Sequence, residues 1–270
     1  DITNLVIEYD LGWATITNSS SLLSYDNDAE QDLTHLYTYL SEVVGLWPDL
    51  EVSNKPTFGK NHVFSNNMTN ELRLVSQLEG PLQISAGFYY EDIDRGRETA
   101  LLWSGSPDLD PGLIQVFEDA IFRTDRKQKA VFGEMLYSIT DQLTATVGAR
   151  YFDYTQTDTI PFLVFLDNEI NLEPSGIEEN GQTLKANLSY QVSDNILVYG
   201  DWSEGFRLGS GQGESPSCNE AGFPNKDVES DTSENFELGL KSSFADGRIT
   251  FNASVYQIDW EGIPVYISPV

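Results

Sequence analysis

The sequence predicts an all-β fold, an antiparallel transmembrane β-barrel of which this chain forms a part, and three observations support this. Apolar and polar residues alternate with a period of two in long segments, as in strands with one apolar and one polar face. These segments are about twice as long as the strands of globular proteins, which average about 5 to 6 residues. The connections alternate between tight turns and long polar loops, which is the topology of an outer-membrane barrel.

The alternation and the turns together define about ten long strands of a larger barrel. We expect strands at about 4–10, 13–26, 66–78, 82–94, 126–139, 143–158, 181–193, 196–208, 232–244 and 248–262. Turn-forming residues join them in pairs. The five expected turns are Asp10–Gly12, Glu79–Pro81, Thr140–Gln142, Ser193–Asn195 and Ala245–Gly247.

The segment 143–158 shows the alternation most clearly. Leu143, Val147 and Tyr151 fall on one face, and Thr146 and Arg150 fall on the other. A barrel in a membrane turns the apolar face of each strand outward and the polar face toward its lumen. We therefore expect Leu143 and Val147 to face lipid.

Two later strands repeat this pattern. Leu184 and Leu188 oppose Lys185, and Ile249 and Phe251 oppose the polar residues between them. The expected lipid-facing set therefore also includes these four apolar residues. Aromatic residues gather near several strand ends, where the interfacial girdles of a membrane barrel lie.

The long connections are expected at about 27–65, 95–125, 159–180 and 209–231, and they are strongly acidic. The chain of 270 residues has 43 Asp and Glu against 15 Lys and Arg, a net charge of −28, and most of that excess lies in these loops. The acidity serves solubility and repulsion between exposed edges, or attracts a cationic or metal-bearing ligand, or bridges to lipopolysaccharide through divalent ions. It argues against nucleic acid as a partner, because nucleic-acid binding needs basic patches.

Other features of the composition limit the possible classes. The lone Cys218 excludes an internal disulfide framework and a multi-cysteine metal site. No apolar run approaches the roughly 20 residues of a membrane helix. The chain opens inside strand-like sequence without a visible signal peptide, so we expect a mature domain or a fragment.

Five segments also resemble one known family. A strand with a Glu and Arg pair, Asn70–Ser76, is followed by a strand at Gly87–Tyr90. A hairpin over Ala130–Tyr151 ends in a G-x-R-Y pattern, and Leu197–Arg207 fits Y-x-x-x-S-x-G-F-[KR]. The hairpin Glu229–Tyr256 fits E-x-x-x-x-Y-E-x-G-x-K, with Phe236 at the tyrosine position. In this order and spacing the segments resemble the TonB-dependent outer-membrane receptors.

The resemblance implies a receptor and transporter in the outer membrane of a Gram-negative bacterium, without catalysis and without a cofactor. Such receptors take up a bulky, scarce solute: a siderophore, haem, a corrinoid or an oligosaccharide. Their barrel has 22 strands around an N-terminal plug that contacts the TonB energy-transducing complex. We expect residues 1–270 to be part of such a barrel, without plug and C-terminal strands. The expected partners are outer-membrane lipid, that complex through the plug, and the solute; we expect a monomer.

The alternation also predicts which polar residues face the lumen. The expected lumen-facing residues are Glu71, Arg73, Arg150, Tyr199, Asp201, Glu237 and Lys241. They either pair with one another and with the plug, or contact the solute directly. Arg73, Arg150, Tyr199, Asp201 and Lys241 are the candidate ligand-binding residues.

Two other functional classes stay open. A secreted, soluble β-rich module that binds carbohydrate also suits exposed aromatics and acidic loops, and it would cover its apolar faces with a second sheet. A ten-stranded outer-membrane protease, as in the omptins, would use a His and an acid to activate water. Only His35 and His62 are available, in a loop that also holds Asp26, Asp28, Asp32 and Asp49.

Other possible sites are weaker. Asp26–Asp32 and Asp108–Gly112 superficially resemble calcium loops, but the first lacks the Gly and Glu that an EF-hand needs. Gly209–Gly213 follows a strand but opens no helix, so it is not a phosphate-binding loop. We therefore expect no metal site and no catalytic residues.

Overall fold

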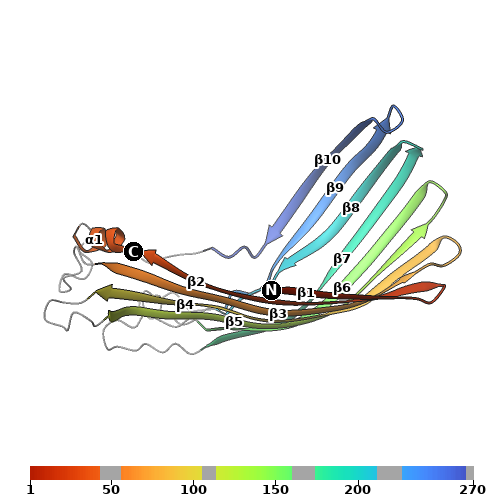
Figure 1. Cartoon of the computed structure of the whole chain (residues 1–270). Coiled ribbons are helices and arrows are strands. Elements are labelled where there is room, and N and C mark those ends of the chain that lie inside the picture. The colour runs from red at the N-terminus through yellow and green to blue at the C-terminus, as the bar shows by residue number, and fades with distance from the viewer. Residues whose placement is uncertain (43–55, 105–113, 160–173, 212–226, 266–270) are drawn as a thin grey trace.

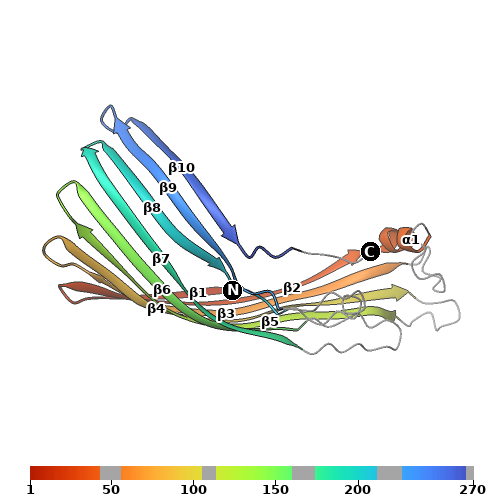
Figure 2. The same ribbon diagram turned by 180° about the vertical axis from the view of Figure 1, so that it is seen from behind.

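The computed structural model describes residues 1–42, 56–104, 114–159, 174–211 and 227–265, and they form one ten-stranded antiparallel sheet. The strands follow chain order from β1 to β10, so every strand pairs with its sequence neighbours (Figures 1 and 2). The elements are β1 (Ile2–Asp10), β2 (Ala14–Asp32), α1 (Thr34–Glu42), β3 (Thr57–Ser76), β4 (Leu82–Ser104), β5 (Ile114–Ser138), β6 (Leu143–Thr159), β7 (Ser175–Ser193), β8 (Ile196–Arg207), β9 (Asp231–Phe244) and β10 (Ile249–Glu261).

The all-β, antiparallel fold and the ten strands are confirmed, and the sheet is part of a barrel that does not close. β1 and β10 are its two edges, and neither has an outer neighbour among the described residues. All five expected tight turns join consecutive strands. Gly12 has a φ of 84° there, and its amide donates to Asp10 Oδ1 at 2.7 Å, as in an Asx turn.

The expected loops are partly wrong, because several strands continue far beyond the predicted ends. β2 runs on to Asp32, β4 to Ser104, and β5 already begins at Ile114. In these stretches the sequence has no regular alternation to indicate a strand, although the backbone ladder continues. The β2 extension is polar on both faces, whereas the β4 and β5 extensions carry apolar residues next to one another, at Leu101–Trp103 and Ala120–Phe122. The helix α1 was also missed; the Asp32 carboxylate accepts a hydrogen bond from the Thr34 amide just before it, at 2.9 Å.

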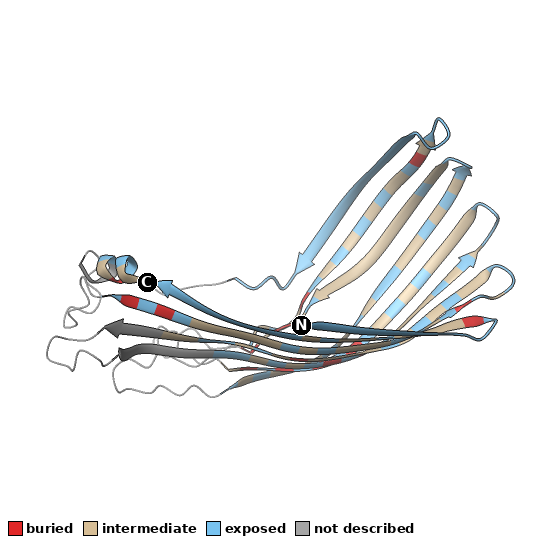
Figure 3. Cartoon of the chain, in the orientation of Figure 1, coloured by how far each residue is buried: buried red, intermediate tan, exposed pale blue. Residues whose placement is uncertain are grey.

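The sheet is a single layer, so its outward face is open. Figure 3 shows few buried positions along the strands. Leu188, Val147 and Phe251 expose 51%, 45% and 57% of their surface. Since no second sheet covers this face in the described parts of the chain, the soluble sandwich is excluded as the fold.

The buried apolar cluster lies on the opposite, inner face, where β8 folds over β6 and β7. The ladder between β7 and β8 ends at Lys185 and Ser203, although both strands continue past this point. Beyond it, Phe206 stacks on Phe152 with ring centroids 3.8 Å apart. The face that carries Phe152 is therefore the inner one. None of the described helices is long and apolar enough to cross a membrane.

Candidate functional site: the inner wall

The strand register places the polar positions of neighbouring strands in continuous rows. Directly paired residues share a face of the sheet, and one such row joins Arg73, Gly87, Phe132, Arg150 and Thr183 from β3 to β7. Arg150 lies two residues from Phe152, so this row is on the inner wall. The same register places all seven residues expected to face the lumen on that wall. Residues an even number apart along a strand share a face, and each of the seven is an even number of residues from one that pairs across the inner wall.

Two of these residues, Arg73 on β3 and Arg150 on β6, lie beside aromatic rings. The Arg73 guanidinium contacts Glu71 at 2.9 Å and lies 5.4 Å from the centre of the Phe132 ring. Arg150 lies 5.3 Å from the centre of the Tyr89 ring. Cation–π contacts of this kind hold a long side chain flat against its neighbour. They fix the guanidinium groups along the wall and leave their N–H edges accessible.

A second group forms on β8 and β9. The Tyr199 hydroxyl donates to the Glu237 carboxylate at 2.5 Å, and Lys241 lies 5.4 Å from the centre of the Tyr199 ring. Asp201 accepts a hydrogen bond from Asn187 on β7 at 3.1 Å. The predicted candidates are thus brought together as two groups, one on β3–β6 and one on β8–β9.

The first group lines a groove of about 390 Å³ with mixed charge. The charged residues of its lining are Arg73, Arg150, Lys185, Glu71, Glu134 and Glu204. Lys185 forms an ion pair with Glu134, a contact that the sequence analysis missed. The groove offers both hydrogen-bond donors and acceptors to a polar solute. Its residues have no geometry of a nucleophile and an activating base.

A polar latch lies farther out on the inner wall and joins three distant segments. The Tyr154 hydroxyl is fully buried, donates to Glu179 at 2.6 Å and accepts from the Gly209 amide at 2.8 Å. The Glu179 carboxylate also accepts a hydrogen bond from the Ser230 amide at 3.1 Å. The latch therefore fastens the segments that leave β8 and enter β9 to the wall of β6 and β7.

The latch shifts the acidity of its own groups. Burial, with the hydrogen bond to Glu179, raises the pKa of Tyr154 to about 12. Burial alone would raise the pKa of Glu179, but the hydrogen bonds from Ser230 and Tyr154 outweigh it and lower that pKa. Tyr154 therefore stays a neutral donor and Glu179 a charged acceptor at neutral pH. The sequence carries no signal for this latch, because its members are up to 76 residues apart.

A second anchor fixes the outer ends of β8, β9 and β10. Arg207 forms an ion pair with Asp231 and lies 5.4 Å from the centre of the Trp260 ring. The Trp260 indole N–H donates to the same Asp231 carboxylate at 3.0 Å. Asp231 is almost fully buried in this arrangement. These three residues were not predicted as a unit either.

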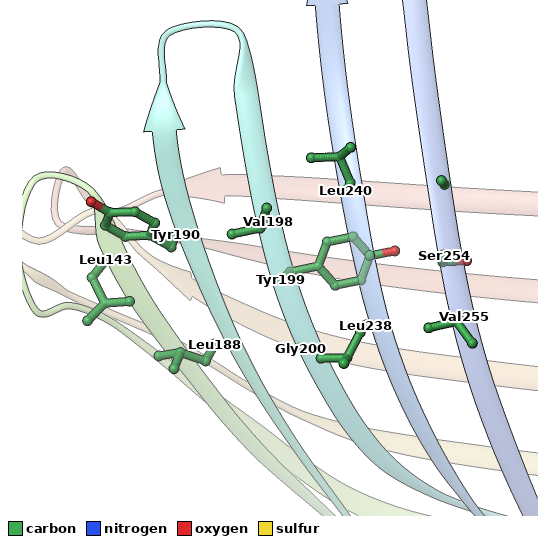
Figure 4. A pocket seen from close by; sticks show the side chains of 12 residues that line it. Leu143, Leu188, Tyr190, Val198, Tyr199, Gly200, Leu238, Leu240, Ser254 and Val255 are labelled. Atoms are coloured by element: carbon green, nitrogen blue, oxygen red, sulfur yellow. The ribbon is translucent and has the colours of Figure 1, made fainter.

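The outward face carries a different hollow, which is apolar. Figure 4 shows this hollow of about 640 Å³, lined by Leu188, Val198, Leu238 and Val255 around Gly200. It exists because Gly200 has no side chain between its bulky neighbours. Apart from the hydroxyl of Tyr190 it offers little hydrogen bonding on that face, so it is a place for hydrocarbon and not for a polar solute.

The alternative sites have separate outcomes. Asp26–Asp32 lies inside the strand β2, so the calcium-loop reading is wrong. His62 lies 2.9 Å from Asp28, but on the outer side of the wall, away from the groove, and His35 lies on α1. Asp49, Cys218 and Asp108–Gly112 lie outside the described residues. The described residues of Gly209–Gly213 form an isolated bridge beside the latch.

The fold and its two faces define the class: a wall of an outer-membrane β-barrel with a polar inside. The profile of the family described as "TonB dependent receptor-like, beta-barrel" matches residues 2–269. The chain belongs to this family of TonB-dependent receptor β-barrels. Members of this family are proteins of the Gram-negative outer membrane.

Solved structures agree with this fold. The ferric yersiniabactin uptake receptor FyuA of Yersinia pestis matches with a TM-score of 0.71 at 14% identity, over 95% of this chain and 35% of its own. The siderophore receptor PiuA of Acinetobacter baumannii matches with a TM-score of 0.63 at 14% identity, over 94% of this chain and 39% of its own. The ferric-catecholate import receptor Fiu of Escherichia coli K12, in its open form, matches with 0.60 at 16% identity, over 97% and 40%. The chain thus spans well under half of each, and these relatives are receptors for import, not enzymes.

Proposed function

We propose that residues 1–270 are part of the barrel of a receptor that captures a bulky, scarce solute and imports it across the outer membrane with energy from a TonB complex. The observation that carries this proposal is the division of one sheet into an apolar outer face and a charged inner wall. An apolar outer face suits lipid, and a wall of fixed donors and acceptors suits a polar solute. The plug, the energy-transducing complex and a monomeric state belong to the same proposal.

The height of the apolar band supports its membrane position. On the outward face of β6 the apolar run extends from Leu143 to Tyr151, with Tyr190 paired beside Leu143. Eight residue steps cover about 27 Å along a strand. At a tilt of about 40° they rise about 21 Å, close to the apolar band of about 25 Å in outer-membrane barrels. Tyrosines at both ends of the band correspond to the two interfacial girdles.

Among the possible solutes we favour a ferric siderophore, with haem, corrinoids and oligosaccharides as the alternatives. The similar structures include receptors named for ferric yersiniabactin, for a siderophore and for a ferric catecholate, which supports this choice. The groove supports it too, because Arg150, which has no ion pair among the described residues, offers a cationic donor to the anionic groups that bind iron in such chelates.

Uptake of labelled solutes tests the proposal. A strain that lacks the full-length receptor should lose uptake of at least one iron-55 chelate, and the wild-type gene should restore it. Restoration should fail when the energy-transducing complex is deleted as well. Unchanged uptake of every ferric chelate, with loss of haem, cobalamin or oligosaccharide uptake, would overturn the siderophore assignment. Unchanged uptake of all four classes would overturn transport itself.

A further inference from the structure

One histidine on the outer side of the wall has carboxylates beside it on both neighbouring strands. His62 on β3 pairs directly with Asp28 on β2 and with Glu98 on β4. Asp26 lies diagonally beside it, opposite Phe64. His62 is ten residues from the outward-facing Leu72, an even number, so this cluster is on the outward face. Along β4, Glu98 is eight residues farther from the turn at Glu79–Pro81 than Tyr90 is. The cluster therefore lies outside the apolar band.

The geometry of the histidine ring is already that of a metal ligand. His62 Nδ1 lies 2.9 Å from Asp28 Oδ1, which holds the N–H on that nitrogen. The ring also stacks on Phe64, with centroids 5.9 Å apart. The other nitrogen, Nε2, then presents its lone pair toward Asp26, whose Oδ2 is 3.7 Å away. A carboxylate that orients a ligating imidazole through its second nitrogen is the usual arrangement at protein metal sites.

The distances also suit an ion. Ligand atoms of Asp26, Asp28 and His62 all lie within 4.8 Å of one another. Two ligands at about 2.0 to 2.1 Å from a tetrahedral zinc ion are about 3.3 Å apart. The present 3.7 Å between Nε2 and Asp26 needs a shift of only a few tenths of an ångström, and both side chains are exposed enough to make it.

Charge points to a cation as well. Lys60, the next outward residue on β3, is already paired with Glu30 at 3.0 Å, and Arg123 is paired with Asp94 and Asp125. Among the described residues, no Lys or Arg ion pair reaches Asp26, Asp28 or Glu98. These three carboxylates therefore have no Lys or Arg to balance their charge in the described part of the chain.

We propose that His62 and Asp26 bind a divalent first-row transition ion of the zinc type on the outer wall, with Asp28 as the residue that orients His62. An imidazole in the donor set selects zinc-type ions over calcium or magnesium, which prefer oxygen ligands alone. The ion would tie β2 and β3 together above the membrane. This inference is independent of the proposed transport, because the cluster lies on the side of the wall away from the groove.

Zinc binding to the full-length receptor tests the site. By isothermal titration calorimetry with ZnCl₂ at pH 7.5, H62Q should lose one bound ion, or weaken one binding event at least tenfold. D28N should weaken the same event by about 10- to 100-fold, as removal of an orienting partner does. H35Q is the matched control, since it removes the other histidine of this chain, and it should leave that event unchanged.

Two results would overturn the proposal. One is an unchanged number of zinc ions and unchanged affinities in H62Q, with circular dichroism showing that the variant is folded. The other is displacement of zinc from the His62-dependent event by a 100-fold excess of CaCl₂, because an imidazole-centred site should keep zinc under that competition. Uptake of the solute should be the same in H62Q and wild type, so that failure here and failure of transport are distinguishable.

Discussion

At the scale of residues, the inner wall places several charged side chains beside an opposite charge or an aromatic ring. Arg73 has both Glu71 and the Phe132 ring, and Lys241 has the Tyr199 ring. These are partly exposed contacts, for which single ion pairs contribute only about 0 to 1 kcal/mol. Their value is therefore mainly in positioning: they hold donors and acceptors at fixed places along the groove.

The latch residue Glu179 gives a prediction for pH dependence. Its pKa is lower in the folded protein, so its contribution is present above the unfolded value of about 4.5. That contribution is lost as pH falls through the folded pKa. E179Q should therefore lower the free energy of unfolding by about 1 to 2 kcal/mol at pH 7, because a charged acceptor is lost. It should also remove part of the loss of stability below pH 4.5.

Urea unfolding of the full-length receptor in lipid at pH 7 and pH 3.5 measures both effects. E178Q serves as the control, since Glu178 is the exposed neighbour on the other face. Equal pH dependence in E179Q, E178Q and wild type would contradict the role given to the latch.

At the scale of elements, several inner-wall glycines make room for a side chain from the next strand. A Cβ added to Gly239 would lie 2.2 Å from the Tyr199 ring, and one added to Gly87 would lie 2.4 Å from the Phe132 ring. Tyr199 and Phe132 are the rings on which Lys241 and Arg73 rest. The flat arrangement of cations along the wall thus depends on the absence of side chains beneath these rings.

G239A should push the Tyr199 ring away from the β9 backbone, over which it now packs. The free energy of unfolding should fall by about 1 to 3 kcal/mol, as it does on overpacking. G133A is the matched control, because a Cβ there meets only ordinary contact at 3.6 Å. Urea unfolding in lipid compares the two variants. A loss of stability in G133A as large as that in G239A would show that the space under Tyr199 is not the cause.

The elements also show what the sequence allows one to predict. For the strands that cross the apolar band, the sequence predicted both the strand and which residues lie on each of its faces. In β6, for example, the apolar Leu143, Val147 and Tyr151 alternate with polar residues such as Thr146 and Arg150. The outer extensions of β2, β4 and β5 were not found, since none of them alternates in this way. The β2 extension is polar on both faces, and those of β4 and β5 carry runs of adjacent apolar residues. The latch and the Asp231 anchor join residues far apart in sequence, and only the register of the sheet brings them together.

At the scale of the whole molecule, a single curved sheet has an apolar outer surface, which suits lipid, and a charged inner surface, which suits water. Within the described ranges of the chain the outward apolar surface is uncovered, and the two edges, β1 and β10, are open. An isolated sheet with open edges tends to aggregate. Further strands and a lipid environment would resolve both problems, as in the larger barrels of the same fold.

The most direct test of this account is folding into lipid after placing one arginine on each face. Val147 is outward and 45% exposed, and its neighbour Thr146 is on the inner wall. V147R should lower the free energy of unfolding of the full-length receptor in lipid by about 2 to 4 kcal/mol if the residue lies near the midplane of the bilayer. T146R should lower it much less, because its charge enters a polar lumen. Equal losses in V147R and T146R would contradict the division of this sheet into a lipid face and a solute face.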